Sequence, residues 1–210
     1  MAVASRPDRA APARRTQAER TAATRGLLLD ATIDCLIEVG YARTTTTLIA
    51  DRAGVSRGAQ VHHFPSKAAL VTEAVDHLAR RRVAEAGGEI ERLGEGRDRV
   101  RSTLDQIWQG QTGDLFKASL ELWVAARTDA ELAEKLAPVE SELREVLMRT
   151  AAAAFGRAIA SRGDFEQLVL MALSTAQGLA LLREYGTPDT ERLWEFARER
   201  LATLFETREK

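Results

Sequence analysis

The stretch that decides the fold runs from Thr45 to Lys67 and reads TTTLIADRAGVSRGAQVHHFPSK. It contains two short helix patterns, each preceded by a residue whose hydroxyl can cap a helix: Thr45 for the first and Ser56 for the second. Gly54 stands between them and allows the left-handed backbone of a sharp turn. Small apolar residues on both patterns let the helices cross closely. The stretch therefore predicts a helix-turn-helix unit.

The second helix, expected over residues 57–64, has the composition of a recognition helix, whose N-terminal residues contact base edges in the major groove. The guanidinium of Arg57 can pair bidentately with O6 and N7 of guanine. Gly58 lets the helix sit close to the groove, and the methyl group of Ala59 can touch a thymine methyl. These three residues are the predicted base-facing positions.

Four flanking residues are predicted to contact the DNA backbone. Thr45 and Thr46 stand at a helix N-terminus, where backbone N–H groups and hydroxyls favour phosphate. His62 and His63 are expected to meet phosphate or sugar. Metal binding by the two histidines is disfavoured, because adjacent helical residues point about 100° apart and no third ligand stands nearby. No metal is therefore expected.

The rest of the chain favours helices throughout. Alanine and leucine dominate the apolar residues, and no strand-like alternation of useful length occurs. The expected helices are about nine: 17–39, 46–53, 57–64, 67–86, 97–110, 115–127, 130–161, 165–184 and 190–207. The fold class is thus all-α, with a small N-terminal head followed by a larger helical body.

Composition and charge restrict the kind of partner and the cellular compartment that the protein is expected to have. Residues 1–82 hold 13 Lys and Arg against 8 Asp and Glu, whereas residues 83–210 hold 17 against 23, so a basic front precedes an acidic back. The single cysteine, Cys35, lies on an apolar helix stripe and is expected in the core. No signal-like or membrane-length apolar run is evident, which favours the cytoplasm and no membrane contact. Residues 1–16 are expected to be a disordered tail, either solvated or reaching into a minor groove.

The segment from about Gln17 to Leu78 resembles the DNA-binding domain of the TetR family of transcriptional regulators. The resemblance rests on an ordered series of residues: Gly40-Tyr41, the threonines, Ile49-Ala50, Ala53-Gly54-Val55-Ser56, Gly58, His63-Phe64, Ser66-Lys67 and Leu70. It implies a helix-turn-helix domain over residues 17–66 and a ligand-binding and dimerisation domain over residues 67–210. It also implies that Lys67 contacts phosphate.

One pair of residues departs from the family pattern. Gln60-Val61 stands where the family usually has a large apolar residue followed by a tyrosine that contacts phosphate. Val61 cannot make that bond. Gln60 either faces adenine, with which an amide pairs bidentately, or lies inward with its amide hydrogen-bonded.

The resemblance implies a small-molecule pocket in the body. An apolar pocket with a few polar groups suits an amphipathic or aromatic effector. The alternative for any one of these side chains is ordinary core. The candidate lining residues are Trp108, Gln111, Phe116, Leu120, Trp123, Met148, Met171 and Thr175.

Small residues recur every four positions at Ala172, Ala176 and Ala180, and small side chains let helices approach closely. Together with the last helix, this segment predicts half of an intermolecular four-helix bundle. The alternative is packing inside one chain. A two-fold dimer would set two recognition helices about 34–36 Å apart. The candidate interface residues are Ala172, Ala176, Ala180, Leu193, Phe196 and Leu201.

The sequence carries no catalytic motif and no cofactor-binding motif, so an enzyme is not expected. The expected function is a sequence-specific regulator, a homodimeric repressor released from double-stranded operator DNA by a small-molecule effector. An activator, or a DNA-binding protein without an effector, is the alternative.

Overall fold

The computed structural model describes residues 16–90 and 97–207. These residues form ten α-helices and no strand, which confirms the all-α class. The helices are α1 (Gln17–Arg43), α2 (Thr46–Ala53), α3 (Arg57–His63), α4 (Lys67–Ile90), α5 (Arg97–Gln111), α6 (Asp114–Ala126), α7 (Ala130–Phe155), α8 (Arg157–Ala160), α9 (Phe165–Glu184) and α10 (Thr190–Glu206).

The helix boundaries follow from local chemistry. Thr16 and Glu19 cap α1 reciprocally, each side chain accepting from the other's backbone N–H. The predicted tail otherwise lies outside the described residues. Gly40, at φ 75°, interrupts α1 where the sequence predicted its end. The helix expected over 130–161 is broken by Gly156, at φ 85°, so α7 and α8 replace one element and the total is ten rather than nine.

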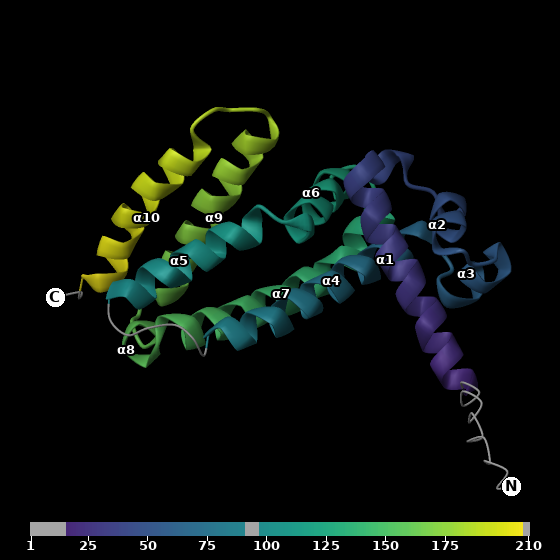
Figure 1. The fold of residues 1–210 in the computed structure, drawn as a ribbon, viewed down its shortest axis with the longest axis horizontal. Helices are drawn as coiled ribbons and strands as arrows, with labels where there is room; N and C mark the ends of the chain where they lie inside the picture. The colour runs from purple at the N-terminus through teal and green to yellow at the C-terminus, as the bar shows by residue number, and fades with distance from the viewer. Residues whose placement is uncertain (1–15, 91–96, 208–210) are drawn as a thin grey trace, which may run out of the picture.

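The molecule is elongated, with α2 and α3 at one end and α9 and α10 at the other (Figure 1). Between them α4 packs along α7, and α1 packs on α6. The N-terminal head has its own core, in which Cys35, Ile49 and Phe64 are buried, as expected for Cys35. The head is therefore a packed unit that presents α3 at the tip of the molecule.

A separate apolar cluster joins the head to the body. Leu36 of α1 and Val71 of α4 pack with Leu122 of α6 and with Leu132 of α7, and all four are fully buried. Because α1 and α4 belong to both this cluster and the head core, a displacement of α6 or α7 acts directly on the head.

The helix α9 is long and apolar enough to cross a membrane by length and composition alone, with a mean hydropathy of 1.4 over its best window. The sequence predicted no membrane span. In the structure α9 packs between α5 and α10, and its residues Val169, Ala172 and Ala176 are completely buried in the body core. A core helix passes the same test, so this feature is weak evidence for a membrane span.

Candidate nucleic-acid interface

The helix-turn-helix is built as the sequence predicted. The hydroxyl of Thr45 accepts from the N–H of Leu48 at 3.1 Å, and that of Ser56 accepts from the N–H of Ala59 at 3.3 Å, so both predicted caps are confirmed. Gly54 adopts the left-handed conformation at φ 64°. The N–H of the next residue then reaches back to the carbonyl of Ala50 at 3.0 Å and closes the turn.

The recognition helix α3 has one buried and one exposed side. Gln60 on α3 and Phe64, which follows it, are buried against the head core. The opposite side carries Arg57, Gly58, Val61 and His62, all exposed, at positions that share one helical face. Packing of the inner side therefore decides which side chains can meet DNA.

Arg57 is exposed and makes no hydrogen bond or ion pair with the described residues. Its guanidinium is thus available for a bidentate contact. Gly58 has nothing within 4 Å of the position a Cβ would take, so its bare backbone is open to a close neighbour. Ala59 is half-buried beside them.

Gln60 takes the inward alternative. Its side chain is only 2% exposed, and its amide nitrogen donates to the carbonyl of Phe64 at 2.9 Å. Its Oε1 atom is buried and has no hydrogen-bond partner among the described residues. The other alternative, pairing with adenine, is incompatible with this position, which corrects the placement of Gln60 among the DNA contacts.

The two histidines lie at the end of α3. His62 is exposed, and His63 is half-buried between His62 and Phe64, with ring centroids at 5.6 Å and 6.4 Å respectively. Within the described part of the chain, no group of three His, Cys, Asp or Glu side chains is arranged to hold a metal. The polar imidazole of His62 is the one directed to solvent.

The backbone-contact candidates divide into two groups. Thr45 is exposed at the N-terminus of α2, and Thr46 beside it is half-buried. Lys67, by contrast, is drawn inward: its Nζ donates to the carbonyl of Tyr41 at 2.6 Å and lies 3.7 Å from the centroid of the Tyr41 ring. Burial lowers the pKa of Lys67. One of the three N–H donors of this ammonium is thus used by Tyr41, and a phosphate contact would use the others.

Tyr41 connects the head to the body through two hydrogen bonds, a role that the sequence did not suggest. Its N–H donates to Glu121 of α6 at 2.7 Å, and its phenol donates to Asp129 at 2.8 Å. Burial, followed by the bond to Asp129, raises the pKa of the Tyr41 phenol, so the phenol remains protonated at neutral pH. A further hydrogen bond connects the head to α7: the hydroxyl of Ser66 donates to Glu131 at 2.8 Å.

The predicted pocket residues do not all lie together. Leu120, Trp123 and Met148 are partly buried around the body core, beside the buried Phe116. The indole N–H of Trp123 donates to Glu140 of α7 at 2.7 Å. These side chains bring α6 and α7 together in the interior of the body.

Of the four other pocket candidates, one is buried in the same core and three are half-buried or exposed. Trp108 is buried and stacked on Trp194 at 5.3 Å, as part of the α5–α10 packing. Gln111 is half-buried at the end of α5. Met171 is exposed on the outer side of α9, and the hydroxyl of Thr175 donates to its carbonyl, so these two do not line the interior.

The interface candidates also divide. Ala172, Ala176, Ala180 and Leu201 are at most 5% exposed and pack within the chain, so these four belong to the body core and their assignment to an interface is corrected. Leu193 and Phe196 of α10 are exposed. Other exposed apolar side chains accompany them on α9, on α10 and just after α9: Leu182, Tyr185, Leu204 and the pocket candidate Met171.

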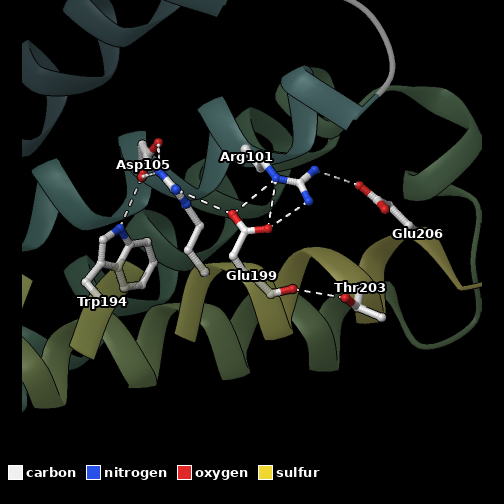
Figure 2. Close-up of polar contacts among 7 residues, drawn as sticks. Arg101, Asp105, Trp194, Glu199, Thr203 and Glu206 are labelled. Atoms are coloured by element: carbon white, nitrogen blue, oxygen red, sulfur yellow. Dashed lines mark hydrogen bonds and ion pairs between the residues drawn. The ribbon is translucent and has the colours of Figure 1, made fainter. Parts of the chain in front are cut away.

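Polar contacts fix α10 on α5 and so determine which side of α10 faces outward (Figure 2). Arg101 of α5 pairs with Glu199 at 2.8 Å, and Arg198 pairs with Asp105 at 2.9 Å. The indole N–H of Trp194 also donates to Asp105, at 3.1 Å. The opposite side of α10, with Leu193 and Phe196, is left uncovered in the single chain.

Comparison with known proteins settles the family. Residues 28–74 match the pattern of "Bacterial regulatory proteins, tetR family". The chain is also 34% identical to the HTH-type transcriptional regulator CymR of Pseudomonas putida, over 95% of this chain and 96% of CymR. The chain belongs to the tetR family. It is accordingly a helix-turn-helix transcriptional regulator and not an enzyme, as predicted.

Solved structures agree on the fold. A regulator from Saccharomonospora viridis in complex with choline superposes with a TM-score of 0.65 at 17% identity, covering 88% of this chain and 96% of that one. FadR from Bacillus subtilis in complex with stearoyl-CoA gives 0.64 at 17% identity, covering 84% and 97%. This tetR-family regulator thus shares the helical body of ligand-binding relatives.

Proposed function

We propose that this tetR-family regulator is a cytoplasmic homodimeric repressor that binds operator DNA through α3 and is released by a small molecule bound in its body. The proposal rests on two surfaces, at opposite ends of the molecule, that the rest of the described chain leaves uncovered. One is the outer face of α3, and the other is the apolar outer face of α9 and α10 (Figure 1).

The DNA side rests on Arg57. An exposed guanidinium without a partner among the described residues, placed at the start of a recognition helix, is suited to O6 and N7 of guanine. Hydroxyl and N–H groups of Thr45 and Thr46 at the start of α2 would donate to the flanking phosphate, and His62 would lie over the DNA backbone. These contacts position α3, whereas Arg57 supplies sequence discrimination.

The dimer rests on exposed apolar area. Phe196 is 62% exposed, and Leu193, Leu204 and Leu182 are each more than 40% exposed on the same end of the molecule. Several large exposed apolar side chains on two packed helices favour an interaction site, and a two-fold arrangement of α9 and α10 would form a four-helix bundle. Such a dimer would place two α3 helices on successive major-groove turns.

The effector site is proposed between α5, α6 and α7, around Leu120, Trp123 and Met148. Partly buried aromatic and flexible apolar side chains suit an aromatic or amphipathic molecule. Relatives with the same fold bind choline and stearoyl-CoA, which supports a small-molecule ligand without naming it. Glu140, already bonded to the Trp123 indole, would supply a polar group there.

Tyr41 would transmit the signal. A ligand that shifts α6 or α7 displaces Glu121 or Asp129, the two partners of Tyr41, and so reorients α1 and α4. The ligand moves this equilibrium only by its different affinity for the two states. Operator DNA must therefore weaken effector binding by the same factor that effector weakens operator binding.

Selection of bound sequences from random duplex DNA, at stated salt, tests the DNA side, and sedimentation of the same sample tests the dimer. We expect a palindromic preference and a dimer whose DNA affinity falls steeply with salt. A thermal-shift screen of aromatic and amphipathic compounds then supplies effectors, whose binding is measured with and without operator. A monomer, or no sequence preference, would refute the repressor assignment; equal effector affinities would remove effector control.

A further inference from the structure

Val61 is an exposed apolar side chain on a surface that should meet DNA. It is 53% exposed on α3, although valine is normally buried. Most other large exposed apolar residues lie on or beside α9 and α10, where a second copy would cover them. Val61, on α3, lies at the opposite end of the molecule from those helices (Figure 1).

The orientation of Val61 is fixed by its neighbours on α3. Gln60 and Phe64 anchor the inner side of the helix, and the guanidinium of Arg25 lies 4.7 Å from the centre of the Phe64 ring. Val61 lies one turn after Arg57, so the two side chains share a face. Gly58, three residues before Val61, leaves the adjoining helix surface without a side chain. An apolar group can therefore approach Val61 closely beside the base pair read by Arg57.

We propose that Val61 is a specificity-determining residue whose isopropyl group packs against the C5 methyl group of a thymine in each operator half-site. The proposal rests on the proposed docking of α3 in the major groove. The thymine methyl is the apolar group that base edges present there. Valine has no donor or acceptor, so it cannot bond to phosphate, and packing it against phosphate would desolvate a charge.

The test replaces single thymines of the selected operator by deoxyuridine, which removes the methyl group and nothing else. Fluorescence anisotropy then gives the affinity of the wild type and of Val61→Ala for each duplex. Loss of one buried methyl corresponds to about a four-fold weaker complex per half-site. We expect this loss for the wild type at one position in each half-site, and little or no loss at that position for Val61→Ala.

Two controls keep the outcome interpretable. Val124→Ala removes an equally exposed valine, 58% exposed on α6, and must retain the sensitivity to deoxyuridine. Val61→Thr keeps the branched shape of the side chain. Its circular dichroism spectrum shows whether the protein still folds when this position is substituted.

Equal sensitivity of wild type and Val61→Ala at every position would overturn the proposal. Uniform weakening of all duplexes by Val61→Ala would overturn it too, because it would place Val61 on sugar. A wild type without sequence preference would instead refute the docking of α3.

Discussion

Replacing Gln60 by leucine is expected to stabilise the protein and to leave its operator preference unchanged. The wild-type side chain is buried, and its Oε1 atom lacks a partner in the described part of the chain. Leucine has a similar size and carries no polar atom, so it removes that orphaned acceptor.

The magnitude follows from three terms, of which the first opposes the other two. The substitution removes the hydrogen bond from Nε2 to the Phe64 carbonyl and leaves that carbonyl without this donor, at a cost of about 1–3 kcal/mol. It also removes the penalty of a buried unsatisfied acceptor, about 1–3 kcal/mol, and adds apolar burial. The balance is a gain of about 1 kcal/mol in the free energy of unfolding, which raises the melting temperature by about 2–4 °C.

Thermal unfolding at a fixed protein concentration measures this gain, and anisotropy with selected operator measures the preference. Gln60→Ala is the matched control, since it leaves a cavity and should destabilise the head. A leucine variant that loses discrimination of an adenine position would show that Gln60 reads DNA. A leucine variant less stable than the wild type would show that the inner hydrogen bond outweighs the orphaned oxygen.

Three further changes test the remaining assignments. Arg57→Ala should weaken operator binding by about 1–3 kcal/mol and relax one position per half-site in a selection, whereas Arg149→Ala on α7 should not; an unchanged preference would remove Arg57 from base reading. Tyr41→Phe deletes the bond to Asp129 and should bring effector affinities with and without operator closer together; an unchanged ratio would place the coupling elsewhere. Phe196→Asp should give a helical monomer in sedimentation velocity, and a persistent dimer would place the interface on another surface.

The sequence by itself determined the helix-turn-helix. Thr45 and Ser56 cap their own helices, and Gly54 sets the turn, through contacts within five residues along the chain. Local contacts of this kind can be predicted from the sequence alone, because the partners are neighbours along the chain. The same locality explains why the all-α class and the exposed Arg57 were predicted.

Tertiary structure decided every question that depended on which neighbour covers a helix face. A small-residue repeat shows that another helix approaches closely, but not whether that helix belongs to the same chain, and α5 and α10 of the same chain cover Ala172 and Ala176. The inward turn of Gln60 and the capture of Lys67 by Tyr41 likewise depend on residues distant in sequence or on the packing of the head core. A side chain's role follows from its environment, and that environment exists only once the helices have packed.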